Sequence, residues 1–182
     1  SHNPARDNGI KFFNANGGKF SVEEEVAIET ALDAHKQCVI GPAQQFADSK
    51  AIYHAMAPYE QHCRQCHQQL DLSQWHLLVD AANGAMSHVA ANVFRAFGAR
   101  VTAIHCDPNG TNINRACGAT DLASLQAAMQ DIGAHLGLAF DGDGDRLQAV
   151  APDGQVLDGD VMLYMIASAR QAEGTLQGGV VG

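Results

Sequence analysis

Between residues 75 and 140, short apolar segments alternate with segments of helical periodicity, and this alternation limits the possible folds more than any other feature. Strands are expected at 76–80, 100–105 and 136–140, with helices at 86–97 and 121–132 between them. Strands joined through helices at this spacing usually pair in parallel and bury their faces under the helices. The sequence therefore predicts an α/β fold with a mixed, mainly parallel sheet flanked by helices.

The segment after residue 146 predicts three further elements. Strands at 147–151 and 155–157 form a hairpin around 152–154, whose Pro-Asp-Gly sequence favours a tight turn. A helix is expected from Asp160 to Ala172, with Asp153, Asp158 and Asp160 acting as turn and cap residues. An apolar segment at 178–182 predicts a last strand, and a buried strand at the final residue would indicate that more protein follows.

The first 74 residues carry a weaker pattern. A short strand at 9–13 and a turn at 14–18 precede a helix that ends near Ala34. Ser21 and Glu24 have the spacing of a capping box, in which each side chain bonds the other residue's backbone N–H. An irregular segment at 38–50 has the composition of a linker, and a second helix is expected at 52–69.

Composition predicts a folded chain with a packed core. Of 182 residues, 46% are hydrophobic and 17% are charged, so disorder is not expected. Twenty acidic against 11 basic residues give a net charge of -9, which argues against binding to nucleic acid or to anionic membrane surfaces. The sequence also contains no apolar run of the roughly 20 residues that a membrane span needs.

The five cysteines favour a reducing compartment, since an odd number in a chain of this size does not suggest a disulfide framework. We therefore expect a cytoplasmic protein. Residues 62–67 read His-Cys-Arg-Gln-Cys-His, which contains a haem-attachment pattern and could also supply part of a zinc site. A polar helix carrying ordinary thiols is the favoured interpretation, because no second Cys-x-x-Cys pair follows.

Residues 141–146 read Asp-Gly-Asp-Gly-Asp-Arg, directly after the predicted strand 136–140. Three carboxylates in so short a loop repel one another unless a cation is bound, and oxygen-only ligands suit Mg²⁺. Gly142 and Gly144 allow positive φ, so the loop can direct Asp141, Asp143 and Asp145 towards one ion. A solvated turn is the simple alternative. An EF-hand is excluded, because Arg146 takes the place of its glycine and Pro152 that of its final glutamate.

Two motifs, in the same order along the chain as in a known family, give the sequence a resemblance to that family. The Ser-His-Asn-Pro sequence at 1–4 and the loop 141–146 resemble the catalytic-serine and metal loops of the α-D-phosphohexomutases. Within that superfamily, residues 7–13, 79–85 and 108–121 are similar to the bacterial phosphoglucosamine mutases. The resemblance implies the C-terminal part of domain 1 at 1–48, domain 2 at 49–157 and the start of domain 3 at 158–182.

The resemblance also implies a reaction and a role for each matching residue. Glucosamine 6-phosphate and glucosamine 1-phosphate would interconvert through a phosphoserine at Ser1 and a sugar bisphosphate. Mg²⁺ would be bound by Ser1, Asp141, Asp143 and Asp145. Lys11 would be the general acid and base, Arg146 would contact phosphoryl oxygens, and His2 and Asn3 would orient the loop and bind the substrate.

Several alternatives stay open at this point. The resemblance implies domains outside this chain, so the isolated segment is expected to be inactive, and a homodimer is allowed for the full-length protein. Phosphoglucomutase or phosphomannomutase specificity is the close rival, since the sugar-reading residues lie elsewhere. A metal-binding module without activity is a second class, and a hydrolase that uses the α-amine of Ser1 as base is a third. We expect Asn109, Asn112 and Asn114 to brace a loop, and His88 and His105 to be structural.

Overall fold

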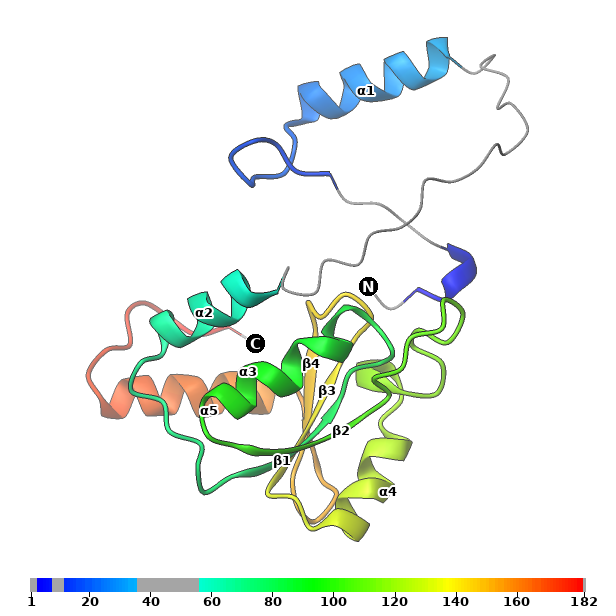
Figure 1. Cartoon of the computed structure of the whole chain (residues 1–182). Coiled ribbons are helices and arrows are strands. Elements are labelled where there is room, and N and C mark those ends of the chain that lie inside the picture. Colours follow the sequence, from blue (N-terminus) through cyan, green and yellow to red (C-terminus); the bar gives the residue numbers. More distant parts are fainter. Residues whose placement is uncertain (1–2, 8–11, 36–55, 182) are drawn as a thin grey trace. The chain divides into compact units, whose positions relative to one another are not determined.

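A computed structural model describes residues 3–7, 12–35 and 56–181 (Figure 1). The chain divides into two compact units: Ser1–Asn8 together with His54–Gly182, and Gly9–Tyr53. The predicted linker at 38–50 lies outside the described residues. The larger unit contains the sheet and the acidic loop, and it is therefore the unit that builds the candidate site.

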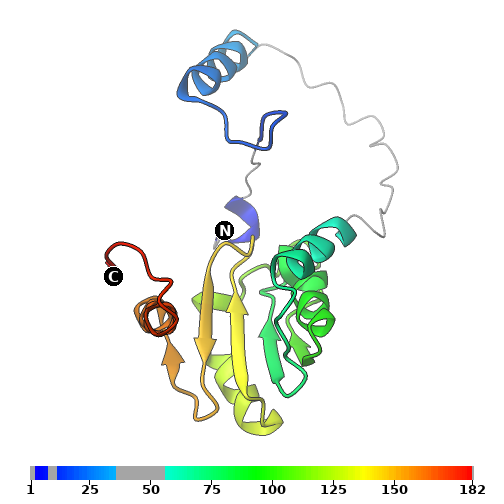
Figure 2. The same cartoon turned by 90° about the vertical axis from the view of Figure 1, so that its left-hand side faces the viewer.

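The larger unit is built on a five-stranded sheet of order β2-β1-β3-β4-β5 (Figures 1 and 2). The strands are β1 (His76–Asp80), β2 (Arg100–Ile104), β3 (Leu136–Phe140), β4 (Leu147–Val150) and β5 (Val156–Leu157). β1 pairs in parallel with β2 and β3, whereas β4 pairs antiparallel with both β3 and β5, so that only β4 runs in the opposite direction. The prediction of a mixed, mainly parallel sheet is confirmed.

Helices cover both faces of this sheet because successive strand residues point to opposite sides. On one face, Leu77 and Val79 of β1 pack in a cluster that includes Phe94 of α3 (Ala90–Ala96) and Met162 of α5 (Gly159–Ala172). On the other face, Leu78 packs with Leu125 and Met129 of α4 (Ala123–Ile132). β1 is buried along its whole length, which explains the continuous apolar sequence at its centre, residues 77–79.

The segment expected as one helix at 86–97 is divided into a 3₁₀-helix, η2 (Ala85–His88), and α3. The reason lies in local hydrogen bonds. The backbone N–H of Ser87 donates to the Gly84 carbonyl, and that of Val89 donates to the Met86 carbonyl, which is the i→i−3 pattern. The Ser87 hydroxyl donates to the Gly84 carbonyl as well, at 2.7 Å, and holds the tight turn. The prediction of a single helix was wrong.

Asp153 and Asp158 act as turn and cap residues, as predicted, whereas Asp160 is not the cap of α5. Asp153 accepts a hydrogen bond from the Gln155 backbone N–H in the turn between β4 and β5. Asp158 caps α5 by accepting from the Val161 N–H at 3.0 Å, and Asp160 lies in the first turn of that helix. Asp121 accepts from the Ala123 N–H at the start of α4.

The strands expected at 100–105 and 178–182 require correction. β2 ends at Ile104, because His105 has a positive φ of 50° that extended strands do not adopt. Residues 178–181 form no strand; Val181 is 89% exposed. No described strand lies beside them to supply ladder hydrogen bonds, and an apolar sequence without such a partner does not form a strand.

The smaller unit confirms the predicted turn and capping box. The Asn14 side chain accepts hydrogen bonds from the Asn16 and Gly18 backbone N–H groups, both at 3.0 Å. Helix α1 (Val22–Ala34) begins with the reciprocal contacts of Ser21 and Glu24. At the predicted strand 9–13, residues 9–11 lie outside the described part, and Phe13 makes a single antiparallel bridge to Lys19.

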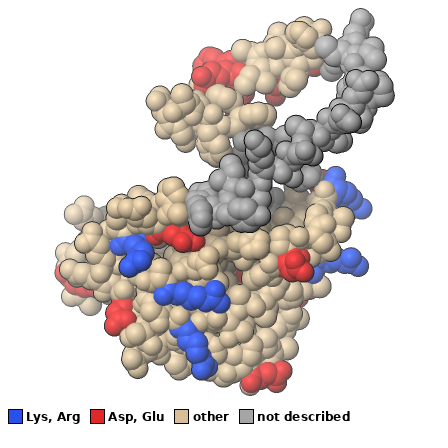
Figure 3. All heavy atoms as spheres, viewed as in Figure 1, with Lys and Arg blue, Asp and Glu red and all other residues tan. Residues whose placement is uncertain are grey.

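Helix α2 (Ala57–Cys66) is shorter than the predicted 52–69; it ends where His67 leaves helical geometry, and residues 52–55 lie outside the described part. Among the described helices, none combines the length and the apolar character that crossing a membrane requires. On the face of the molecule in Figure 3, Lys and Arg side chains are interspersed with Asp and Glu.

Candidate functional site

The acidic loop follows the carboxyl end of β3, and its three aspartates converge. Each of Asp141, Asp143 and Asp145 offers a carboxylate oxygen, and these oxygens lie within 4.8 Å of one another. Exposure rises along the loop, since Asp141 is fully buried, Asp143 is half-buried and Asp145 is exposed. The loop thus has one anchored end and one end open to solvent, as a site that admits an ion from solution requires.

Backbone hydrogen bonds hold the loop closed. The Asp141 Oδ1 atom accepts from the Arg146 N–H at 3.1 Å, and the Asp141 N–H donates to the Arg146 carbonyl. The Gly142 carbonyl accepts from the Ala85 N–H at 2.9 Å, which ties the acidic loop to the segment after β1. Two neighbouring strand ends therefore fix the position of the carboxylates.

Glycine is needed at Gly144 for both its backbone conformation and its packing. Gly144 has a φ of +75°, and a Cβ there would lie 2.6 Å from Cγ of Met86. Gly142 does not have a positive φ, contrary to the expectation for both glycines. The close packing reaches Gly84, where a Cβ would meet the Gly142 carbonyl oxygen at 2.3 Å. The acidic loop and the segment that follows β1 therefore pack with their backbones in direct contact.

The donor set fits a hard divalent cation. Oxygen ligands at short range are what Mg²⁺ and Ca²⁺ prefer, and sulfur and nitrogen ligands are not part of this group. The buried Oδ2 atom of Asp141 has no hydrogen-bond partner among the described residues. A buried carboxylate oxygen without a partner is costly. A bound cation would remove that cost, so the residues of the loop fit the predicted magnesium site.

The three carboxyl groups also perturb one another's ionisation. Desolvation, together with hydrogen bonding to and repulsion by Asp141 and Asp143, raises the pKa of Asp145 above its ordinary value of 3.8. A raised carboxyl pKa means that the folded protein without a cation holds this proton more tightly than the unfolded chain does. The stabilisation that protonated Asp145 gives to the folded protein is therefore present below the ordinary pKa. It is lost as the pH rises through the raised pKa.

We expect Mg²⁺ binding to this loop to weaken as the pH falls, because the cation competes with the proton of Asp145. Calorimetric titration at about pH 7.5 and about pH 4 should give a clearly higher Kd at the lower pH, by roughly tenfold for each unit below the raised pKa. Asp145→Asn, which cannot titrate, should flatten this dependence. Equal Kd values at both pH values would contradict the prediction.

Of the other predicted site residues, the structure describes Arg146 and Asn3. Arg146 is exposed and closes the acidic loop through its backbone. Ser1, His2 and Lys11 lie outside the described residues. Asn3 is described and exposed, and its carbonyl accepts a hydrogen bond from the side chain of Asn114 at 3.3 Å. Asn114 in turn donates its backbone N–H to the Ala82 carbonyl, two residues after β1.

The asparagine-rich loop at 106–117 is braced by its own side chains, as predicted. Asn112 Oδ1 accepts from the Asn109 N–H, and Asn109 Oδ1 accepts from both the N–H and the hydroxyl of Thr111. The Asn112 side chain also donates to the Asp107 carbonyl at 2.9 Å. These contacts give a loop without regular structure a defined shape beside the carboxyl ends of β1 and β2.

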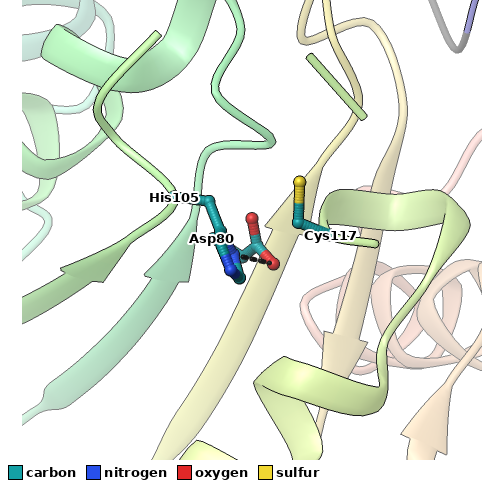
Figure 4. Close-up of side chains that lie close together, drawn as sticks. All are labelled: Asp80, His105 and Cys117. Atoms are coloured by element: carbon teal, nitrogen blue, oxygen red, sulfur yellow. Dashed lines mark ion pairs between the residues drawn. The ribbon is translucent and has the colours of Figure 1, made fainter. Parts of the chain in front are cut away.

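Sequence reasoning missed a second group of potential ligands, formed by Asp80, His105 and Cys117 (Figure 4). Asp80 is the last residue of β1, His105 follows β2, and Cys117 precedes the 3₁₀-helix η3 (Gly118–Thr120). The prediction that His105 is merely structural did not consider its place after a strand. The predicted carboxyl ends of 76–80 and 100–105 were the available signal, since adjacent parallel strands end at the same edge of a sheet.

The cysteine and histidine residues at 62–67 do not form a described metal-ligand group. Cys66 Sγ lies 3.4 Å from Nε2 of His62, one turn earlier on α2, and Cys63 and Cys66 are free thiols. Groups of three or more potential ligands occur, among the described residues, only at the two places above. Cys63 and Cys66 lie on a helix, as expected, and their interpretation as ordinary thiols stays a prediction.

The sequence and the fold both match known proteins. The profile described as phosphoglucomutase/phosphomannomutase, alpha/beta/alpha domain II, matches residues 57–154, and the profile for domain I matches residues 1–38. Curated proteins named phosphoglucosamine mutase align over the whole chain. Those from Idiomarina loihiensis and Methylobacillus flagellatus are 46% and 48% identical to it. The chain spans only 41% and 40% of the length of these two relatives.

Solved structures give the same result for the fold. A phosphoglucomutase/phosphomannomutase family protein from Burkholderia thailandensis is 29% identical, with a TM-score of 0.57 over 63% of this chain and 26% of that one. A second structure, from Thermus thermophilus, is 23% identical and has a TM-score of 0.68, covering 95% of this chain and 40% of its own. At that identity the second match supports the fold alone.

Proposed function

Since the chain belongs to the phosphoglucomutase/phosphomannomutase family, we propose that it is the part of a phosphoglucosamine mutase that contains the phosphoserine and metal loops. The reaction would interconvert glucosamine 6-phosphate and glucosamine 1-phosphate. It is assigned to a polypeptide of the relatives' full length, of which this chain spans about 41%. The 182-residue segment by itself is not expected to turn over substrate.

The observation that carries the proposal is the convergence of Asp141, Asp143 and Asp145 on one point at the carboxyl end of β3. These residues are the proposed protein ligands of Mg²⁺, together with Ser1 once it is phosphorylated. Bound there, Mg²⁺ would act as a Lewis acid that neutralises charge on the phosphoryl oxygens. The contact between Asn3 and Asn114 supports this assignment, since it joins Asn3 to the loop that lies beside β1 and β2.

The chain's own residues would carry the transfer. In the proposed step, a sugar hydroxyl oxygen attacks the phosphorus of phosphoserine, the bond from phosphorus to Ser1 Oγ breaks, and Lys11 takes the hydroxyl proton. The sugar bisphosphate then turns around, and Ser1 accepts the phosphoryl group from its other end. His2 and Asn3 would orient the serine loop. In each transfer Lys11 returns the proton to the leaving oxygen, which is Ser1 Oγ in the first transfer and the sugar oxygen in the second, so that bonds and protons balance.

Arg146 is proposed to bind phosphoryl oxygens at the mouth of the loop. Its backbone N–H is fixed by Asp141, while its side chain is exposed. A planar guanidinium offers paired donors that match phosphate geometry, which lysine cannot reproduce. The backbone anchor would set the origin of the side chain and leave its head group able to reach the substrate.

The division of the chain follows from the same proposal. Residues 1–48 would belong to domain 1, residues 49–157 to domain 2 and residues 158–182 to the beginning of domain 3. We propose a bacterial cytoplasmic enzyme, which the four described cysteines, all free thiols, support. A homodimer is compatible with the full-length protein.

The test is an assay of a full-length polypeptide that contains this chain. Glucosamine 6-phosphate, glucose 6-phosphate and mannose 6-phosphate are compared as substrates with Mg²⁺ and a trace of the matching bisphosphate. Faster turnover of the glucosamine ester, with phosphate on Ser1 detected by peptide mass spectrometry, is expected. Ser21 is the internal control: it caps α1 and should stay unmodified.

The alternatives give distinct results in the same assay. A preference for the glucose or mannose ester would assign the chain to a phosphoglucomutase or phosphomannomutase, which is the close rival. Absence of turnover on all three esters, with Ser1 unmodified, would leave a metal-binding module and would overturn the mutase proposal.

A further inference from the structure

A second cluster of ligand atoms lies at the same edge of the sheet as the acidic loop but is made of different chemistry. Asp80, His105 and Cys117 each offer one atom, and these atoms lie within 4.8 Å of one another. Asp80 and Cys117 are completely buried, while the His105 side chain is 29% exposed. Figure 4 shows the three side chains lying close together, on three separate segments, with the ion pair between His105 and Asp80 marked. The partly exposed histidine leaves a route from solvent to the cluster.

The contact between His105 and Asp80 is close without being a hydrogen bond. His105 Nδ1 lies 3.0 Å from Asp80 Oδ2, yet the buried Nδ1 atom has no hydrogen-bond partner with acceptable geometry among the described residues. Two ligands of a tetrahedral zinc ion, each about 2.0–2.1 Å from the metal, lie about 3.3 Å apart without bonding to each other. The observed separation is therefore close to that of two atoms that face a common ion.

Backbone donors hold the Asp80 carboxylate in place. Oδ1 accepts from the Ala82 N–H and Oδ2 accepts from the Gly118 N–H, both at 2.9 Å. Each carboxylate oxygen has a second lone pair, so these bonds leave acceptor capacity for a metal. Ligands oriented by such outer hydrogen bonds are typical of metal sites in proteins.

We propose that Asp80, His105 and Cys117 bind a thiophilic divalent cation of the zinc class, at a site separate from the magnesium loop. A thiolate, an imidazole and a carboxylate form a mixed ligand set that suits zinc and does not suit Mg²⁺. Three protein ligands leave the fourth tetrahedral position for water. The ion would cross-link the ends of β1 and β2 to the segment before η3.

Burial, followed by the nearby Asp80 carboxylate, raises the pKa of Cys117 to about 11. Loading the site must therefore displace the thiol proton, as is usual when zinc binds cysteine. Cys106 is a useful comparison, because it is adjacent in sequence to His105, is half-buried and donates its thiol to the Ile104 carbonyl.

The test is titration of the chain with Co²⁺ alone, a spectroscopic substitute for zinc. Cys38, Cys63 and Cys66 are first changed to serine, so that Cys106 and Cys117 are the remaining thiols. We expect one equivalent of Co²⁺ to give a thiolate-to-cobalt charge-transfer band and the intense visible bands of tetrahedral cobalt. Zn²⁺ should remove both, and a large excess of Mg²⁺ should leave them unchanged.

Matched variants then identify the ligands. Cys117→Ser should abolish the charge-transfer band, and His105→Asn should raise the Kd for Co²⁺ at least tenfold. Asparagine tolerates the positive φ of residue 105, so the second variant should keep its fold; circular dichroism and thermal unfolding check both. Cys106→Ser and Asp143→Asn should bind Co²⁺ as the parent does.

Three results would overturn the proposal. One is the absence of any thiolate-to-cobalt band at one equivalent of Co²⁺. Another is a band that disappears in Cys106→Ser and survives in Cys117→Ser. The third is unchanged affinity in a folded His105→Asn variant, which would leave only an ion pair beside a buried thiol. None of these measurements depends on mutase activity, so the proposed function is tested separately.

Discussion

Asp143→Asn is expected to weaken Mg²⁺ binding to this chain by about 10- to 100-fold, which corresponds to about 1.4–2.8 kcal/mol. The substitution keeps the size of the side chain and one oxygen, but it removes one negative charge from the three-carboxylate group. Asp143 is chosen because Asp141 also holds the loop backbone through Arg146, so that changing Asp141 would confound affinity with folding. Isothermal titration calorimetry at neutral pH measures the effect.

Asp153→Asn is the matched control for this experiment. It removes the same charge from an exposed turn between β4 and β5, where asparagine can still accept the hydrogen bond from the Gln155 N–H. Its Kd for Mg²⁺ should stay within about twofold of the parent value, as expected for a screened charge outside the site. Unchanged affinity in Asp143→Asn, or equal losses in both variants, would remove the acidic loop as the Mg²⁺ site.

Gly118→Ala is expected to lower the free energy of unfolding by about 3 kcal/mol, combining backbone strain with overpacking. Gly118 has a φ of +70°, and a Cβ there would lie 2.5 Å from both Cβ of Ala82 and the carbonyl oxygen of Phe140. The Phe140 atom belongs to the backbone at the end of β3 and cannot rotate away. The added methyl would therefore push η3 from the strand that leads into the acidic loop.

Gly154→Ala separates the two contributions to this loss. Gly154 also has a positive φ, of +86°, but a Cβ there would meet nothing within 4 Å. Gly154→Ala should therefore lower the free energy of unfolding only by the cost of the left-handed backbone conformation, about 1 kcal/mol. Urea unfolding followed by circular dichroism gives both values, and a Gly118→Ala loss no larger than that of Gly154→Ala would falsify the close-packing account.

The strands and the acidic loop were predictable because their signals are local. β1 has an apolar centre between His76 and Asp80, β3 is an apolar run throughout, and both strands had the expected bounds. The convergence of the three aspartates was equally accessible, since ligands at alternate positions of one short loop cannot lie far apart. The capping box of α1 and the asparagine-braced loop follow the same rule, because their partners lie within five positions in sequence.

The errors arose where a distant segment decided the local structure. The helix expected at 86–97 begins instead with the local i→i−3 turns of η2, and the first residue of η2, Ala85, is also bonded through its N–H to the distant Gly142 carbonyl. The apolar residues at 178–181 have the composition of a strand, but no described neighbour pairs with them. In both cases the intrinsic preference was present, and the contacts across the fold decided the outcome.

The sequence by itself determined the α/β architecture, the acidic loop and the family resemblance, because each depends on residues that are adjacent or follow a short period. Only the tertiary structure brought together Asp80, His105 and Cys117, which are separated by 25 and 12 positions and share no motif. Their meeting depends on the parallel pairing of β1 with β2 and on the path of the loop before η3. Such pairing is set by burial of the whole sheet, and no local stretch of sequence encodes it.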